Sequence, residues 1–348
     1  MNRLELRDRI DELDYLRGFA LLGILLLNVI SLLKIPVPQP DSMGETYQRM
    51  LYLFGEARFF SIFSFLFGIG FYMFISRAND KGHNGMLLFL RRILVMFVFG
   101  IIHSYFHPGE ALAIYAVCGL LLLPMFKVKR PINLIIGIIL MVLFSYTGSK
   151  VLLPLPFILL GIAAGQYGVF EQLAKRRKVL IIVTLIMASV AAASLVYQYQ
   201  QAPTAPFQPY AVAGTGDPII EQANLYMKIG IWNSAIVSFA YAGILLMLLQ
   251  ARWFRKLLFP MKALGRLALT NYIGQTVLVL VAGHWLNLIG SIGLFESLVL
   301  CVGIYIFQML FSVIWLEYFV MGPLEWIWRA ATYLQWPPLR RQKRMMNG

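Results

Sequence analysis

The sequence has little charge for its length. Only 13% of its 348 residues are Asp, Glu, Lys or Arg, whereas 59% are hydrophobic. Soluble domains are about 25% charged and roughly 45–50% apolar, and one soluble core cannot bury so large an apolar excess. Intrinsic disorder, collagen and coiled coil are excluded by the same composition.

Cysteine is nearly absent, and the familiar catalytic motifs are missing. Cys118 and Cys301 both lie within apolar runs, which excludes a disulfide framework and a paired-cysteine redox motif. We find no glycine-rich phosphate loop, Walker lysine, serine-hydrolase elbow or metalloprotease motif in the right context. Function must therefore be sought in isolated polar side chains.

What the sequence has in abundance is apolar runs of bilayer length. Because about 20 apolar residues cross a bilayer as a helix, we predict an all-α, polytopic integral membrane bundle with about ten transmembrane helices. The predicted spans are 16–33, 59–76, 87–105, 110–126, 132–146, 152–170, 179–197, 229–250, 264–286 and 295–320.

Basic residues predict the orientation of these spans. With ten spans and a cytoplasmic N-terminus, 25 of the 30 Lys and Arg residues fall on one face, among them Arg3, Arg7 and the tail at 340–344. Lys and Arg in short loops stay on the cytoplasmic side. The pattern predicts both termini inside and contact with anionic lipid headgroups. A nucleic-acid partner is not expected, since no soluble domain remains to bind one.

The chain is predicted to form one integral membrane domain over residues 1–348. Within it we expect an N-terminal helical set at 1–197, an outer loop at 198–228 and a C-terminal helical set at 229–348. The outer loop is assigned from its Gln, Pro and Gly content. No internal repeat is evident, so an inverted-repeat transporter has no direct support.

Polar residues in the first span are few. Asp14 and Arg17 are one helical turn apart and can pair on one face. They form either an interfacial salt bridge or an anchor for an anionic cofactor that enters from the cytoplasm. Asn28 lies about 16 Å further along the helix, and an Asn at that depth often bonds only to a neighbouring helix.

The third predicted span begins near Arg91 and Arg92 and ends near His103. His107 follows one turn later, and Glu110 starts the next span, so these three side chains could converge near the outer face. We interpret His103 as a general base that Glu110 orients. Alternatively, His103 is a buried, hydrogen-bonded His beside a helix start. A metal is not predicted, because no further ligands cluster there.

The ninth predicted span carries a polar stripe. Asn271 and Gln275 are four residues apart within 265–275, a segment that also contains small residues. Such a stripe either packs helices together through amide hydrogen bonds or lines a path for a substrate.

Five segments resemble, in order, signatures of the YeiB-like bacterial membrane proteins, a family defined as a domain of unknown function and loosely labelled as transport-related. They are LDYLRGFALLGI at 13–24, FSFLFGIGF at 63–71, Arg91-Arg92 followed by Gly100 and His103, the segment 265–275, and GPLEWIWR at 322–329. The likeness covers almost the whole chain. More widely, the sequence is similar to the transmembrane acyltransferase superfamily, which includes the acyltransferase-3 and heparan-glucosaminide acetyltransferase types.

The wider resemblance implies acyl transfer across a membrane, from cytoplasmic acyl-CoA to a hydroxyl or amine of an envelope or lipid-linked acceptor. Acyltransferase-3 proteins place an Arg near the start of the first helix and a His 11 residues later. Arg17 matches the Arg, but Asn28 stands where the His would be. Because Asn cannot act as a general base, His103 with Glu110 is the expected replacement.

The other roles follow from the same resemblance. Arg17, Arg91 and Arg92, with Asp14, would hold the CoA phosphates at the inner face. Asn28, Asn271 and Gln275 would line the substrate path, and Asn28 could polarise the thioester carbonyl. Acyl-CoA would be a co-substrate, and no tightly bound cofactor is expected.

The leading interpretation is therefore a multi-pass acyltransferase of the bacterial plasma membrane. A transporter or lipid flippase that uses the same polar path is the alternative, and a non-catalytic membrane scaffold is a further one. The acyltransferase interpretation predicts that Arg17, Asn28, His103 and Glu110 line one cavity open to the cytoplasm. The sequence does not determine the oligomeric state.

Overall fold

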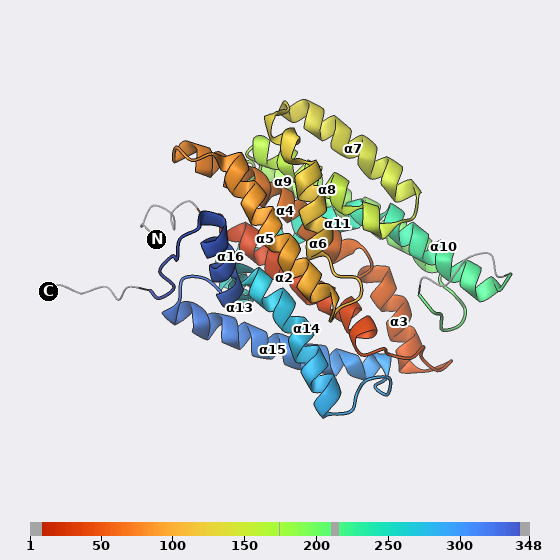
Figure 1. Cartoon of the computed structure of the whole chain (residues 1–348). Coiled ribbons are helices and arrows are strands. Elements are labelled where there is room, and N and C mark those ends of the chain that lie inside the picture. The colour runs from red at the N-terminus through yellow and green to blue at the C-terminus, as the bar shows by residue number, and fades with distance from the viewer. Residues whose placement is uncertain (1–8, 174, 210–215, 342–348) are drawn as a thin grey trace.

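The computed structural model describes residues 9–173, 175–209 and 216–341, and in these ranges every regular element is a helix (Figure 1). The α-helices are α2 (Asp11–Leu32), α3 (Met43–Phe54), α4 (Arg58–Asp80), α5 (Gly85–Ser104), α6 (Leu112–Leu121), α7 (Arg130–Tyr146), α8 (Pro154–Gln166), α9 (Arg177–Gln200), α10 (Pro218–Trp232), α11 (Ser234–Leu248), α12 (Arg252–Leu257), α13 (Phe259–Arg266), α14 (Ala268–Trp285), α15 (Leu294–Tyr318) and α16 (Pro323–Tyr333). The predicted all-α helical membrane bundle is confirmed.

The helices differ in whether each is long enough to cross a membrane. Five segments are long and apolar enough on their own, and two bent helix pairs raise the number to seven. Three shorter apolar helices, α6, α7 and α8, complete the set. Each of the ten predicted spans overlaps one of these segments of the described residues, while the number of crossings and the inward orientation of both termini stay predictions.

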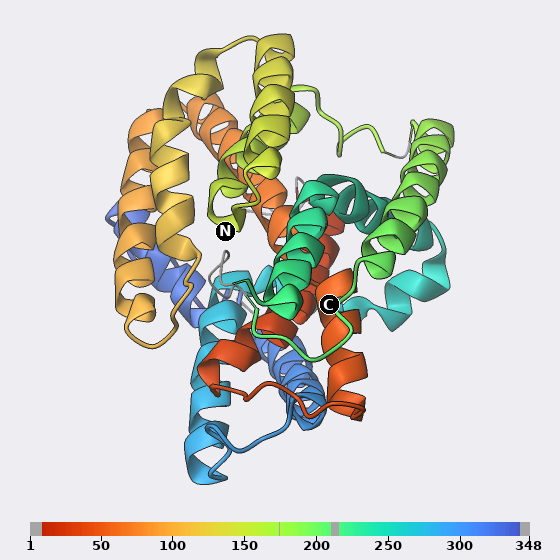
Figure 2. The ribbon, with the colours of Figure 1, turned by 90° about the vertical axis from the view of Figure 1, so that its right-hand side faces the viewer.

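Helix α4 lies in the middle of the bundle, between α2, α5, α8 and α11 (Figures 1 and 2). Glycine permits its closest contact. A Cβ at Gly68 would lie 2.0 Å from the carbonyl oxygen of Ile158, and a Cβ at Gly161 would lie 2.1 Å from that of Phe65. The segment around Gly68 therefore packs helix on helix, as small residues do in membrane bundles.

The beginning of α2 lies with α13 and α16 at one end of the bundle (Figure 1), and the ion pair between Arg255 and Glu12 places α12 there as well. Two ion pairs join α2 to this end, from Lys262 to Asp11 and from Arg255 to Glu12, each at 2.5 Å. A Cβ at Gly265 would lie 1.9 Å from the carbonyl oxygen of Asp14, so α13 can approach α2 only with glycine at this position.

The predicted ninth span, 264–286, is wrong in its first residues. The helix breaks at Leu267, and α13 meets α14 at 92°. Two side chains bond to backbone groups that the break frees. The Asn271 amide donates to the carbonyl of Leu264 at 2.9 Å, and Glu325 Oε1 accepts from the backbone N–H groups of Leu269 (2.7 Å) and Thr270 (3.2 Å). A break at membrane depth is tolerated when such groups are satisfied inside the protein.

Two further details differ from the sequence prediction. The eighth span is broken at Asn233, where α10 and α11 meet at 53°. Part of the predicted outer loop 198–228 is helical, because α10 begins at Pro218 behind the N-cap Asp217. Pro fits the first turn of a helix, where no N–H partner is needed.

Helix α3 lies in the connection between the first two predicted spans. Ser42 caps it by accepting from the backbone N–H of Glu45 at 3.2 Å, and Glu45 accepts from the N–H of Asp41 at 2.7 Å. Ser followed three residues later by Glu is a helix-start signal. The sequence therefore held the information for this helix.

Arg58 fixes the other end of the bundle. Its guanidinium is fully buried and donates to the carbonyl of Glu56 (2.8 Å), the side chain of Gln198 (2.8 Å) and the carbonyl of Gly230. These bonds tie the start of α4 to α9 and α10. Of the basic residues used for the topology prediction, Arg3, Arg7 and those beyond Arg341 lie outside the described residues.

Candidate functional site

His103 and Glu110 form a buried pair at the turn from α5 to α6. His103 Nδ1 lies 3.4 Å from Glu110 Oε1, and the two residues are 4% and 6% exposed. The other ring nitrogen, Nε2, lies 2.9 Å from the hydroxyl oxygen of Thr276 on α14. The structure thus brings the two predicted catalytic residues together and adds a hydroxyl from 173 positions further along the chain.

The start of α6 holds the Glu110 carboxylate in place. Its Oε1 accepts from the backbone N–H of Leu112 at 2.5 Å, and its Oε2 accepts from that of Ala113 at 2.9 Å. Gly109 supplies the turn before it with a φ of 93°, which favours glycine. These bonds fix the carboxylate toward His103, as the positive end of a helix dipole also does.

This arrangement defines which ring nitrogen can act as a base. A carboxylate accepts hydrogen bonds, so Nδ1 of His103 donates to Glu110 and Nε2 is left as the acceptor for the Thr276 hydroxyl. Glu110, His103 and Thr276 thus form a row of carboxylate, imidazole and hydroxyl. In such a row the carboxylate orients the imidazole, which can then take a proton from an oxygen nucleophile.

His107 lies beside this pair without a partner of its own. Its ring centroid is 5.6 Å from that of His103, and both of its nitrogens are buried with no hydrogen-bond partner among the described residues. Burial, with a smaller contribution from His103, lowers the pKa of His107 to about 4. In the described ranges no group of three His, Cys, Asp or Glu residues is placed to hold a metal.

A groove of about 580 Å³ between α5 and α14 reaches His103 and Thr276. Its remaining lining residues are Phe99, Ile102, Phe106, Ile273, Val277, Leu280, Val281, His284, Trp285 and Leu324. Arg17, Asn28 and Glu110 are not among them, so this groove is not the predicted single cavity open to the cytoplasm.

The predicted cofactor residues Asp14 and Arg17 lie together in the first turns of α2, at the end of the bundle that the charge pattern predicts to be cytoplasmic, here termed the inner end. Asp14 is buried and accepts from Arg9 at 2.6 and 2.9 Å and from Arg17 at 3.1 Å. Two guanidinium groups therefore share one carboxylate. Burial opposes the charge of Arg9, but the carboxylate of Asp14 outweighs it and raises the pKa of Arg9. Arg17 remains partly exposed, with 28% of its side chain accessible.

Arg92 lies close to Arg17 in space, near enough for the two charges to repel. Its guanidinium carbon lies 5.0 Å from the ring centroid of Phe74 and 3.6 Å from that of Trp328. Arg91 takes no part in this stack and has no ion pair or hydrogen bond in the described ranges. The structure brings Arg92 to the inner cluster without Arg91, because adjacent residues of a helix point in different directions.

The three predicted path residues are placed differently from one another. Asn271 donates to the carbonyl of Leu264 and to Ser312 on α15, both at 2.9 Å, and Gln275 donates to the carbonyl of Leu21 at 3.3 Å. Both are buried and bond between helices, which is the packing role weighed for them. Asn28 is half-buried on α2, and no hydrogen bond of the described residues joins it to His103.

Comparison with known proteins places the chain in a family. A model described as a protein of unknown function (DUF418) matches residues 164–335. The chain is 49% identical over 343 residues, and 99% of each chain, to an "Uncharacterized 39.9 kDa protein in amylase 3'region" of Bacillus acidopullulyticus. It is also 24% identical to YeiB of Escherichia coli over 405 residues, which cover 92% of this chain and 95% of YeiB. The chain belongs to the YeiB-like DUF418 family.

A third relative, YxaH of Bacillus subtilis, is 26% identical over 404 residues, which cover 97% of this chain and 98% of YxaH. No solved structure matches the chain. In this YeiB-like protein the DUF418 match runs from the end of α8 past α16, so it contains Thr276 and Trp328 but not His103 or Glu110.

Sequence reasoning did not single out Thr276. It lies next to Gln275 in the polar stripe, but Gln275 bonds to α2 whereas Thr276 bonds to α5. The only local signal is a hydroxyl in a membrane helix, and such hydroxyls commonly bond to their own backbone. The partner of Thr276 is decided by how α14 is rotated against α5.

Proposed function

We propose that the protein is an acyltransferase of the bacterial plasma membrane. It would move an acyl group from cytoplasmic acyl-CoA to a hydroxyl or amine of an envelope or lipid-linked acceptor. The observation that carries the proposal is the buried Glu110–His103 pair with a hydroxyl at the free ring nitrogen. A scaffold has no need of a carboxylate-oriented imidazole in a membrane.

In the proposed reaction the acceptor hydroxyl takes the position at Nε2 of His103 that the Thr276 hydroxyl now marks. Nε2 accepts the proton, the acceptor oxygen bonds to the thioester carbon, and the carbon–sulfur bond breaks. The proton then passes from His103 to the departing thiolate. Glu110 keeps Nδ1 protonated and stabilises the imidazolium while it exists.

The inner arginines support the choice of an anionic donor. Six arginines interact electrostatically at this end, namely Arg9, Arg17, Arg92, Arg266, Arg329 and Arg341. The carboxylates that interact with them are Asp11, Asp14 and Glu325. Six cations therefore face three anions, which leaves a local positive surplus for phosphate groups. Arg266 donates one bond to the carbonyl of Val320 at 3.2 Å, and its Nε is buried without a partner.

The donor has to connect the two ends of this arrangement. Eleven residues of α5 separate Arg92 from His103, which corresponds to about 16 Å. The groove at His103 does not include Arg17. The proposal therefore requires the donor to open a passage between the inner arginines and His103 when it binds.

Binding of acyl-CoA to purified protein, measured by calorimetry, tests the donor site. We expect Arg17→Ala to weaken binding by roughly 10-fold to 100-fold, the value of a lost charge-assisted hydrogen bond. Arg252→Ala, on an exposed side chain of α12, is the matched control and should change affinity by less than about threefold, since surface charges contribute little. No binding in a folded, monodisperse preparation contradicts the proposal.

Turnover tests the base. His103→Ala should keep acyl-CoA binding and lower thioester cleavage in the presence of an acceptor by about 10²- to 10⁴-fold. His83→Ala, in an exposed loop, is the control and should be neutral. Substrate flux in liposomes without thioester cleavage would instead establish the transporter or flippase alternative.

A further inference from the structure

The groove between α5 and α14 differs from the rest of the apolar surface because it has a polar floor. Its walls include the exposed side chains of Ile102, Phe106 and Val277, which point outward where a membrane helix contacts hydrocarbon. At its floor lie His103 and Thr276, which are 4% and 3% exposed and bonded to each other. An apolar molecule in this groove therefore touches the proposed catalytic pair.

The groove runs along α14 from Thr276 toward Trp285. Thr276 and Trp285 are nine residues apart on α14, which corresponds to about 14 Å along the helix axis. The stretch between them presents Val277, Leu280 and Val281 to the groove. From the polar pair, the groove thus continues for about 14 Å as a mostly apolar strip, with His284 near its far end.

The position of the inner arginines decides which end of an occupant lies at His103. Arg17 and Arg92 lie on the side of His103 that faces away from Trp285, since Arg92 and the start of α14 both contact α16, and α5 meets α14 further along, at His103 and Thr276. A donor held by its phosphates at these arginines would present its thioester at His103. Its acyl chain would then extend along α14 toward Trp285.

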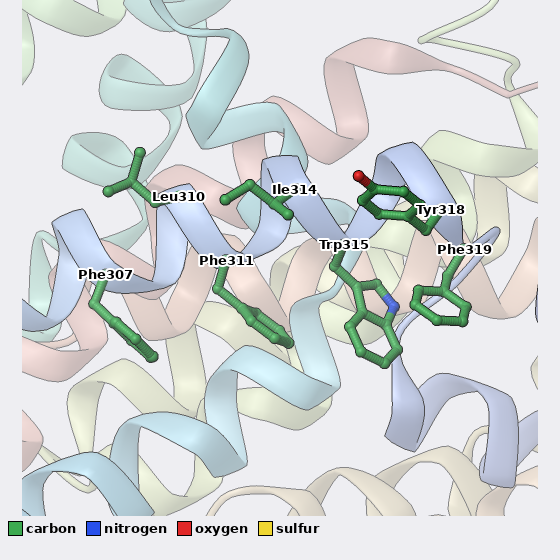
Figure 3. Close-up of a pocket in the computed structure, with 7 residues that line it drawn as sticks. All are labelled: Phe307, Leu310, Phe311, Ile314, Trp315, Tyr318 and Phe319. Atoms are coloured by element: carbon green, nitrogen blue, oxygen red, sulfur yellow. The ribbon is translucent and has the colours of Figure 1, made fainter.

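A second apolar groove, of about 430 Å³, offers a comparison on α15. Figure 3 shows Phe307, Phe311, Trp315 and Phe319 on one side of that helix. The Trp315 and Phe319 rings stack at 4.1 Å, and the Trp315 indole N–H donates to the carbonyl of Met321 at 2.9 Å. The described residues that line this groove include no carboxylate, His, Lys or Arg. It serves as an internal control for contact with bulk lipid.

We propose that the groove between α5 and α14 binds the acyl chain of the donor, so that the preferred substrate is a long-chain acyl-CoA rather than acetyl-CoA. The part of this inference that concerns acyl transfer rests on the proposed acyltransferase function. The part that concerns binding of the acyl chain does not, since an apolar chain can occupy the groove whether or not transfer follows.

The test compares acyl-CoA donors of increasing chain length with the full-length protein in lipid nanodiscs. Each methylene that enters the groove should tighten binding by up to about fourfold, the equivalent of one buried CH₂. Affinity should rise with chain length and level off when the groove is full. Val277→Trp, which fills the groove, should reduce the affinity for the long-chain donors and leave that for acetyl-CoA unchanged. Val299→Trp, on an exposed position of α15 outside both grooves, is the matched control.

A second measurement does not depend on a substituted protein. A long-chain acyl-CoA with a photoreactive group at the chain end should label residues 277–285 of α14 much more strongly than the residues that line the α15 groove. Equal labelling of both grooves would identify ordinary lipid contact and overturn the inference. Affinity that does not depend on chain length, with no effect of Val277→Trp, would also overturn it while leaving acyl transfer intact. Groove labelling without any thioester cleavage would support the binding site and contradict the proposed reaction.

Discussion

The ring of Trp328 lies over the guanidinium of Arg92, with the guanidinium carbon 3.6 Å from the ring centroid. The Trp328 indole N–H donates to the backbone carbonyl of Arg92 at 2.7 Å, across 236 positions of the chain. The same helix, α16, caps the start of α14 through Glu325. One short C-terminal helix therefore positions both an inner arginine and the helix that carries Thr276.

Replacement of Trp328 should weaken this contact in two steps. Trp328→Phe loses the indole hydrogen bond and should cost about 1 kcal/mol of stability. Trp328→Ala also loses the stack on Arg92 and should cost about 3 kcal/mol. Thermal unfolding in detergent measures both. Trp285→Ala, on an exposed side chain, should leave the midpoint within error, and an equal loss there would contradict the assignment.

Glu325 should matter because it caps another helix. Its carboxylate accepts three hydrogen bonds, from Leu269, from the Thr270 backbone and from the Thr270 hydroxyl at 2.5 Å. Glu325→Ala should cost about 1–2 kcal/mol, as the loss of a good N-cap does. Glu325→Gln keeps one acceptor oxygen and should cost less. Glu296→Ala, in the exposed first turn of α15, is the comparison, and unfolding by denaturant ranks the three variants.

Gly265 should not tolerate a side chain. A Cβ there would lie 1.9 Å from the Asp14 carbonyl oxygen, so Gly265→Ala must push α13 away from α2. We expect lower yield of folded protein and weaker acyl-CoA binding, because Arg17 lies one turn further along α2. Gly303→Ala has open space around its Cβ and should be neutral or slightly stabilising, since Ala favours helix by about 1 kcal/mol. Identical behaviour of the two variants would argue against close α2–α13 packing.

His107 should make the protein sensitive to acid. Its pKa is about 4 in the folded state because burial disfavours the charged ring, whereas an unfolded His titrates near pH 6.5. Above pH 6.5 both states are neutral and the residue has no effect. Between pH 6.5 and 4 the unfolded state takes up the proton first, so stability falls by up to about 3 kcal/mol as the pH drops.

Replacement of His107 by an apolar ring tests this origin. His107→Phe should flatten the decline between pH 6.5 and 4, measured as the free energy of unfolding in detergent. At neutral pH it should be as stable as the parent or more so, because two buried nitrogens without partners are removed. His83→Phe, in an exposed loop, should leave the slope unchanged. A decline that persists in His107→Phe would locate the acid sensitivity elsewhere.

Local sequence patterns predicted contacts between residues that are close in the chain, but not the contacts between distant residues. The pairing of Asp14 with Arg17 followed from their spacing, and that of His103 with Glu110 from a short turn between two helices. The break at Leu267 did not follow, since no Pro interrupts 264–286. Two distant features hold it open, which are the Asn271 bond across the break and the Glu325 cap.

The sequence by itself determined the all-helical membrane class and the positions of the apolar segments, because hydropathy and charge act over a single helical span. It also determined that few polar side chains remain to carry chemistry. Only the tertiary structure decided which of them meet. His103 bonds to Thr276, Arg92 stacks on Trp328, and Asn28 and Arg91 stay outside both clusters. Those contacts depend on how each helix is rotated about its own axis, which the packing of the whole bundle fixes.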